Sequence, residues 1–236
     1  MFSFFIRGAE MMGHPVNRGR SDRDFSLDTY RKLARNYDHS CHRIEPLRRL
    51  TVALLALKPG DTVFDVASGT GLSLPLLAAQ VGASGRVVAI EQSPQMAELG
   101  LMRGLANVEH VIAPVEEAPL ILQADALLFH YTHDVLRNPD ALAHLFAHAK
   151  PGARVAVAGF KLADGWRALF NPFFRRRAWG YLSTFEGAER PWSILAQYVP
   201  DFTIVAEAFL HSGYIGAGRF TSAPETGVSR PWRNNP

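Results

Sequence analysis

Val63-Phe64-Asp65-Val66-Ala67-Ser68-Gly69-Thr70-Gly71-Leu72 is the stretch that decides the fold of this chain. A short apolar run with the composition of a buried strand leads into a turn of small residues, and an apolar helical pattern follows from Leu72. Because glycine has no side chain, the backbone of such a turn can approach a ligand closely. The stretch therefore predicts a ligand site at the carboxyl end of a strand.

Two carboxylates belong to this predicted site. Glu91 ends the next strand, 20 residues after Gly71, where an acid can bind a pair of ribose hydroxyls. Asp65 lies close to the turn, where it would repel a pyrophosphate but attract an ammonium group beside a sulfonium. Residues 69–74 also lack the third glycine of a dinucleotide fingerprint. A cationic ligand is therefore favoured. In the alternative interpretation no ligand is bound: Asp65 caps the turn, and Glu91 is a solvated strand end.

The rest of the chain alternates strand-like and helix-like segments, as in a doubly wound parallel sheet. Strands are predicted at residues 62–66, 86–91, 108–113, 124–130 and 153–160, and helices at 26–37, 42–57, 72–81, 94–104 and 139–149. Residues 202–210 and 214–220 read as two more strands joined by a tight hairpin, so the last strand must run antiparallel to its neighbour. Residues 161–198 interrupt this alternation and are crowded with aromatic side chains.

Composition limits the class of protein. The 236 residues are 47% hydrophobic and 20% charged, with a net charge of +3, which fits one globular domain and gives no reason to expect a nucleic-acid partner. The single cysteine, Cys41, excludes an internal disulfide, and no apolar run is long enough to cross a bilayer. We expect a cytoplasmic monomer or homodimer with a domain over residues 25–220, a mobile leader over 1–24 and a mobile tail over 221–236.

Four stretches resemble motifs of the class I S-adenosylmethionine-dependent methyltransferases. They are Asp65-Val66-Ala67-Ser68-Gly69-Thr70-Gly71, Val88-Ala89-Ile90-Glu91-Gln92-Ser93, Asp125-Ala126-Leu127-Leu128-Phe129-His130 and Ala149-Lys150-Pro151-Gly152-Ala153-Arg154. The resemblance covers residues 26–220 and is nearest in style to methyltransferases of quinone precursors and phospholipid head groups. It implies an enzyme with S-adenosylmethionine as cofactor and S-adenosylhomocysteine as product. It also implies an α/β, Rossmann-like sheet of seven strands ordered 3-2-1-4-5-7-6, with strand 7 antiparallel and helices on both faces.

The resemblance assigns cofactor-binding residues, with two departures from the family's pattern. Ala67 stands where the motif has its first glycine, which is acceptable if Ala67 keeps a negative φ. Pro114 stands where many relatives have an acid that binds adenine, so that contact would depend on the backbone of Val115 or on Glu116. The candidate cofactor residues are Tyr37, Asp65, Ala67, Ser68, Gly69, Gly71, Glu91, Gln92, Met96, Pro114, Val115, Glu116 and His130.

Candidate catalytic residues follow the fourth predicted strand. Methyl transfer to a phenol, alcohol or acidic carbon needs a general base, whereas a neutral amine does not. His133 has a side chain suited to that task, and Asp134 is a candidate to orient it. A plain polar loop is an equally good interpretation of either residue. The expected reaction is methyl transfer to oxygen or nitrogen of a small-molecule acceptor.

Other features of the sequence are compatible with more than one kind of methyl acceptor. Tyr30 and Tyr37 lie seven residues apart, on one face of the first helix, and Tyr37-Asp38 resembles a signature of the same families. We interpret residues 161–198 as a cover for a hydrophobic or aromatic substrate, and Arg175-Arg176-Arg177 as a contact for an acidic group or a peripheral membrane surface. Alternative functions are a phospholipid N-methyltransferase at the membrane surface, a nicotinamide oxidoreductase and a non-catalytic cofactor-binding domain.

Two groups of histidines invite a metal interpretation. His39-Ser40-Cys41-His42 offers several ligand types in a short stretch, and His144 and His148 share a helix face. Neither group has the spacing of a complete ligand set, and the chain has no paired cysteines. We therefore expect no metal site.

Overall fold

The computed structural model describes residues 23–178 and 182–221. The predicted mobile leader and tail lie outside these ranges, apart from Arg23 and Asp24, which begin the first helix, and Thr221. No helix within the described ranges is both long enough and apolar enough to cross a membrane.

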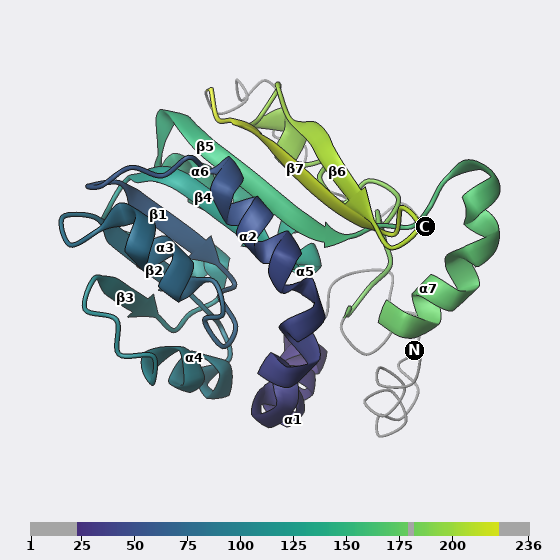
Figure 1. Ribbon diagram of the computed structural model, residues 1–236, viewed down its shortest axis with the longest axis horizontal. Coiled ribbons are helices and arrows are strands. Elements are labelled where there is room, and N and C mark those ends of the chain that lie inside the picture. The colour runs from purple at the N-terminus through teal and green to yellow at the C-terminus, as the bar shows by residue number, and fades with distance from the viewer. Residues whose placement is uncertain (1–22, 179–181, 222–236) are drawn as a thin grey trace, which may run out of the picture.

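A seven-stranded sheet forms the centre of the molecule (Figure 1), in the order β3-β2-β1-β4-β5-β7-β6. The strands are β1 (Thr62–Val66), β2 (Arg86–Ile90), β3 (Val108–Val111), β4 (Ala124–His130), β5 (Ala149–Phe160), β6 (Thr203–Ala208) and β7 (Gly213–Arg219). The first five strands pair in parallel, whereas β7 runs antiparallel to both β5 and β6. The predicted order and the antiparallel seventh strand are confirmed.

Helices cover both faces of the sheet. The α-helices are α1 (Arg23–Cys41), α2 (Glu45–Leu54), α3 (Leu74–Val81), α4 (Pro94–Leu101), α5 (His133–Leu136), α6 (Pro139–Ala147) and α7 (Asn171–Ala178). Short 3-10 helices are η1 (His42–Ile44), η2 (Val115–Glu117), η3 (Gly165–Phe170) and η4 (Leu195–Gln197). Successive strand residues point to opposite faces, so Val63 packs with α2 and α3 while Phe64 packs with α6. Two separate hydrophobic clusters result, one under each helical layer.

Several predicted boundaries shift in the structure. The helix predicted to end at residue 57 ends at Leu54, just before Ala56 takes a left-handed conformation with φ 44°. The strand predicted from residue 153 begins at Ala149, and the short helix α5 was not predicted. Residues 209–212 form a wider loop than the predicted tight hairpin, with three successive residues at positive φ. In contrast, Ser93 caps α4 as predicted, because its hydroxyl accepts from the Met96 amide.

The sheet register brings the predicted site residues to one edge. Val66 is the register partner of Ile90, so β1 and β2 end side by side and the glycine loop begins next to Glu91. The Ser68 amide donates to the Ile90 carbonyl at 2.9 Å, which fixes the start of that loop. On its other side β1 pairs with β4, which ends at His130. The strand order reverses at β1, because β2 and β3 follow on one side and the chain then crosses over to β4 on the other side. Ligands bind at such switch points in open α/β sheets.

Candidate active site

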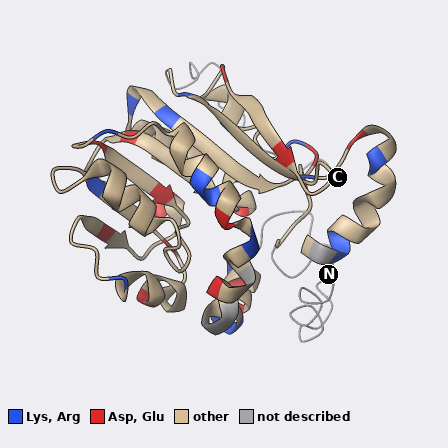
Figure 2. Cartoon of the chain, in the orientation of Figure 1, with Lys and Arg blue, Asp and Glu red and all other residues tan. Residues whose placement is uncertain are grey.

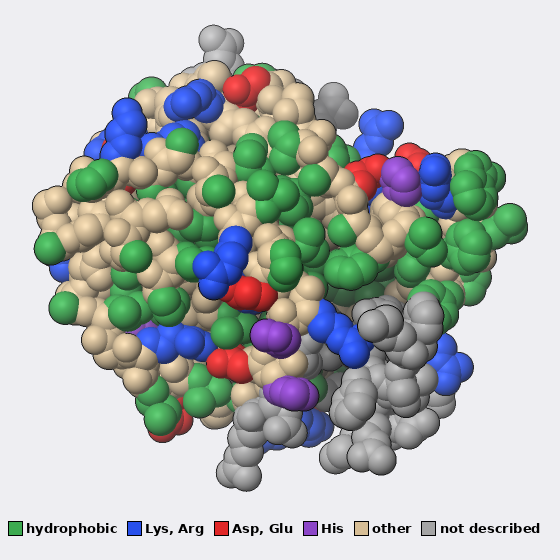
Figure 3. Space-filling model, in the orientation of Figure 1, with side chains coloured by type: hydrophobic (Ala, Val, Ile, Leu, Met, Phe, Trp, Pro, Cys, Tyr) green, Lys and Arg blue, Asp and Glu red, His purple; other side chains and the backbone are tan. Residues whose placement is uncertain are grey.

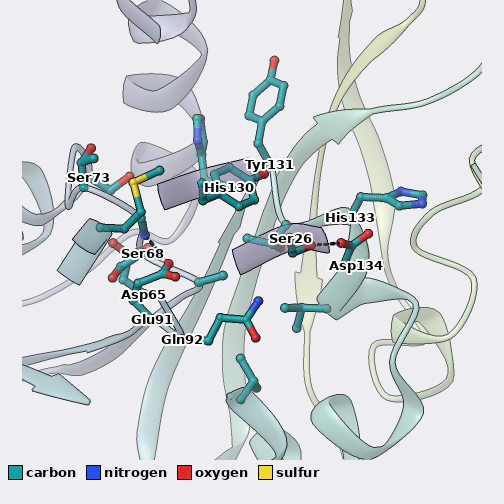
Figure 4. Close-up of a pocket in the computed structure, with 18 of the residues that line it drawn as sticks. Ser26, Asp65, Ser68, Ser73, Glu91, Gln92, His130, Tyr131, His133 and Asp134 are labelled. Carbon is teal, nitrogen blue, oxygen red and sulfur yellow. Dashed lines mark hydrogen bonds between the residues drawn. The ribbon is translucent and has the colours of Figure 1, made fainter. Parts of the chain in front are cut away.

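A pocket opens at the carboxyl ends of β1, β2 and β4 and is closed on one side by α1 and α2 (Figure 4). It brings together most of the residues predicted from sequence. The predicted residues that line it are Tyr37, Asp65, Ala67, Ser68, Gly69, Glu91, Gln92, Met96, Val115, Glu116, His130, His133 and Asp134. Gly71 and Pro114 are the two predicted residues that the structure leaves out of the lining.

Asp65 is a buried carboxylate without a full set of partners. Its side chain is 2% exposed, and Oδ2 has no hydrogen-bond partner. Burial raises the pKa of Asp65 to about 7, although the positive charge of Arg48 opposes this shift. Keeping an unpaired carboxylate out of water is costly. The pocket is therefore built to receive a cationic or hydrogen-bond-donating group beside Asp65.

Arg48 lines the same pocket from α2, and sequence reasoning missed it. The residue is 3% exposed; its Nη1 donates to Glu45 on the same helix, and its buried Nε has no partner. A buried cation and a buried carboxylate thus face one cavity, each with an unsatisfied atom. An α-amino acid group, which carries an ammonium and a carboxylate, complements this pair of charges.

Glu91 holds the glycine loop in place. One carboxylate oxygen accepts from the Gly69 amide and the other from the Ser93 amide, both at 2.8 Å. Burial raises the pKa of Glu91, and these two amides oppose the shift. The interpretation of Glu91 as a solvated strand end is wrong, because the residue is only 8% exposed.

The glycine loop differs from expectation at two positions: in the φ angle of Ala67, and in the absence of Gly71 from the pocket lining. Ala67 has φ 52°, so the expected negative φ is wrong; an L-residue in this region is strained by roughly 1–2 kcal/mol. Such strain is commonly retained where a loop must present its backbone to a ligand. Gly71, with φ +74°, serves packing: a Cβ there would lie 2.6 Å from Leu74 Cδ1 and 3.1 Å from the Gly100 backbone.

The far side of the cofactor region is formed by the loops after β2 and β3. Met96 is buried in the first turn of α4, and Val115 is buried in η2. Glu116 follows Val115 into the pocket lining, whereas Pro114 only precedes η2 in an extended conformation. Of the three residues predicted near adenine, Val115 and Glu116 line the pocket and Pro114 does not.

His133 and Asp134 lie in a second region of the pocket, whereas Figure 4 draws His130 nearer to Ser68 and Asp65. Burial lowers the pKa of His130 to about 3. Burial also lowers the pKa of His133, against the influence of Asp134, and neither ring nitrogen of His133 makes a hydrogen bond of good geometry. In Figure 4 the His133 ring points away from Asp65 and Glu91. His133 is thus neutral near pH 7 and lies apart from the predicted cofactor residues.

Asp134 does not orient His133 by a hydrogen bond. Its Oδ2 accepts from Ser26 at 3.0 Å and from Ser183 at 2.7 Å (Figure 4 draws the Ser26 bond). Ser26 belongs to α1, whereas Ser183 belongs to the aromatic segment that follows β5. Asp134 therefore links α1 to the segment after β5 by hydrogen bonds beside the pocket. Neither serine was predicted as a site residue.

The prediction that Tyr30 and Tyr37 share one face of α1 is confirmed. The Tyr30 and Tyr37 rings meet edge to face with centroids 6.1 Å apart, and both residues line the pocket. Asp38 does not line the pocket itself, but it accepts from the Thr70 hydroxyl of the glycine loop and from Arg103 at 2.9 Å. Across residues 23–178 and 182–221 no cluster of three or more His, Cys, Asp or Glu side chains could hold a metal ion.

Comparison with known proteins agrees with this geometry. A family model described as protein-L-isoaspartate(D-aspartate) O-methyltransferase matches residues 21–113. The demethylmenaquinone methyltransferase of Symbiobacterium thermophilum is 38% identical over 216 residues, covering 80% of this chain and 84% of that protein. The chain belongs to the class I S-adenosylmethionine-dependent methyltransferases. The cofactor of this methyltransferase is accordingly S-adenosylmethionine, and the charged pair Asp65 and Arg48 fits its methionine end.

A further relative takes part in quinone biosynthesis by name, and a solved structure shares the fold. The ubiquinone/menaquinone biosynthesis C-methyltransferase UbiE of Ectopseudomonas mendocina is 32% identical over 120 residues, so the match spans about half of each chain, 48% and 47%. The N-methyltransferase NodS of Bradyrhizobium japonicum, solved with S-adenosyl-L-homocysteine, superposes with TM-score 0.62 over 83% of this chain and 98% of NodS. Because NodS is only 13% identical, this likeness shows the fold alone.

Proposed function

We propose that this methyltransferase methylates a ring carbon of a hydroxylated aromatic acceptor of the quinone-precursor kind. The observation that carries the methyl-transfer part is the buried, unpaired Asp65 carboxylate facing one pocket with the buried Arg48. The acceptor class is supported by the relatives, which are named demethylmenaquinone methyltransferase and ubiquinone/menaquinone C-methyltransferase. Carbon thus replaces the oxygen or nitrogen acceptor expected from sequence.

The chain's own residues account for cofactor binding. When bound, S-adenosylmethionine supplies a methyl group on a positively charged sulfur. Asp65 would bind the ammonium of the methionine end and Arg48 its carboxylate, as charge-assisted hydrogen bonds. Glu91 would accept from ribose hydroxyls with the lone pairs that Gly69 and Ser93 leave free.

The acceptor would lie on the His133 side of the pocket. Transfer to a ring carbon requires loss of the phenolic proton, formation of a carbon–carbon bond as the carbon–sulfur bond breaks, and loss of the proton from the methylated carbon to solvent. The ring oxygen then takes a proton back, so one proton is released overall. His133, neutral because burial lowers its pKa, can accept the phenolic proton. Asp134, which binds Ser26 and Ser183, would hold α1 and the aromatic segment over the acceptor and exclude water.

Ligand binding tests the cofactor assignment. Calorimetry should show that the protein binds S-adenosylhomocysteine, and that Arg48→Ala weakens this binding by about 10- to 100-fold, the range for one charge-assisted bond. Binding of 5′-methylthioadenosine, which lacks the amino acid group, should change little in the same variant. An equal loss for both ligands would mean that Arg48 only supports the fold, and no binding by folded wild-type protein would refute the proposal.

The acceptor is tested separately. A reduced 1,4-naphthoquinone without its ring methyl group is incubated with the protein and S-adenosylmethionine carrying a labelled methyl group. The label is expected on a ring carbon, identified by NMR of the product. A label on oxygen, or transfer only to amine acceptors, would overturn the carbon assignment while leaving cofactor binding intact.

A further inference from the structure

Helices η3 and α7 form an arm that projects from the carboxyl edge of the sheet (Figure 1). The arm, residues 165–178, follows β5, and its base is fixed by two hydrogen bonds of 2.9 Å between the Asn171 side chain and the Ala163 backbone. Phe174 is 5% exposed and anchors α7. The arm therefore has a defined attachment to the domain, on the edge where the pocket opens.

The outer side of this arm exposes large apolar side chains to solvent. Trp166 is 67% exposed, Leu169 82% and Phe173 54%. Figure 3 shows hydrophobic side chains gathered at the edge of the molecule where Figure 1 places α7. Contiguous apolar surface of this kind on a soluble domain usually marks a docking site, because leaving it in water is unfavourable.

The arm carries positive charge without compensating negative charge. Arg167, Arg175 and Arg176 lie among the aromatic residues, and no acidic residue occurs between Asp164 and Glu186. Figure 2 shows basic but no acidic colouring on α7. The Arg167 guanidinium lies 4.8 Å from the Trp166 ring centroid, and Arg175 lies at the same distance from Phe185. Aromatic and basic side chains on one short helical segment are typical of elements that lie in the headgroup region of a bilayer.

We propose that the η3–α7 arm docks this protein on the surface of an anionic lipid bilayer. The exposed apolar side chains would enter the headgroup boundary, and the arginines would pair with lipid phosphates. The carboxyl edge of the sheet would then face the bilayer, so a membrane-dissolved acceptor could reach the pocket without crossing water. The inference concerns the surface of the chain and is independent of which acceptor atom is methylated.

Vesicle sedimentation tests this inference with the full chain. The protein should bind vesicles of phosphatidylcholine with phosphatidylglycerol, and binding should fall as salt is raised. Arg175→Ala/Arg176→Ala should weaken binding about 25-fold, since each basic residue near an anionic surface contributes about 1 kcal/mol. Trp166→Ala/Leu169→Ala should weaken binding even at high salt, where the apolar part dominates.

A matched control removes the same charge from the opposite edge of the sheet. Arg86 and Arg219 are exposed at the start of β2 and the end of β7, so Arg86→Ala/Arg219→Ala should bind vesicles like the wild type. Equal losses in both double variants would reduce the effect to net charge and overturn the proposal. Absence of wild-type binding, or binding lost only when residues 1–22 are removed, would also overturn it. Calorimetry with S-adenosylhomocysteine on each variant confirms folding and tests the cofactor site separately.

Discussion

Replacement of the buried Gly71 by alanine is expected to destabilise the fold through both its backbone conformation and its packing. Gly71 has φ +74°, a left-handed conformation that costs an alanine roughly 1–2 kcal/mol. The new Cβ would lie 2.6 Å from Leu74 Cδ1 and 3.1 Å from Gly100 Cα. The leucine can rotate, but the Gly100 backbone can move only with α4, and such overpacking costs typically about 1–3 kcal/mol. The free energy of unfolding should therefore fall by about 2–5 kcal/mol.

Urea unfolding of two variants separates these contributions. Gly104 has a similar φ of +63° but no atom within 4 Å of an added Cβ, so Gly104→Ala should lose only the conformational part, about 1–2 kcal/mol. The difference in unfolding free energy between the two variants then measures the packing of the loop against Leu74 and Gly100. Equal losses in Gly71→Ala and Gly104→Ala would refute the assignment of Gly71 to packing.

Two further predictions concern the ionisable groups of the pocket. Burial raises the pKa of Asp65 from 3.8 to about 7, so between about pH 4 and pH 7 the folded, ligand-free protein binds a proton that the unfolded chain has released. The contribution of this group to the stability of the wild type therefore falls as the pH rises through that window. Asp65→Asn should unfold at a higher urea concentration than the wild type at pH 8 but not at pH 4. A difference that does not depend on pH would contradict the buried, unpaired state of Asp65. For His133, whose pKa burial lowers, turnover with a hydroxylated acceptor should rise with pH only below about pH 6.5 and be level at neutrality. His133→Ala should lower turnover by about 10²–10⁴-fold with S-adenosylhomocysteine affinity unchanged, and near-full turnover in the variant would exclude His133 as the base.

The sequence by itself determined the sheet, the position of the glycine loop and most of the residues that line the pocket around Asp65 and Glu91. Strand and helix periodicities and the turn residues at 67–71 are local signals, and the sheet order followed from the family that the motifs resemble. Because parallel strands end at a common edge, the sequence alone places Asp65 and Glu91 together, as the register of β1 and β2 confirms. The acceptor side had no comparable local pattern.

Only the tertiary structure decided which distant residues complete the site. Arg48 belongs to no recognisable motif. Its role depends on the packing of α2, which brings its side chain to the cavity that Asp65 also lines. Asp134 was paired in sequence with its neighbour His133, yet it binds Ser26 and Ser183, which are 108 and 49 residues away. Local spacing specifies the backbone conformation of a segment, whereas the partner of a buried polar group is set by whichever element packs against it. That packing is a property of the whole fold.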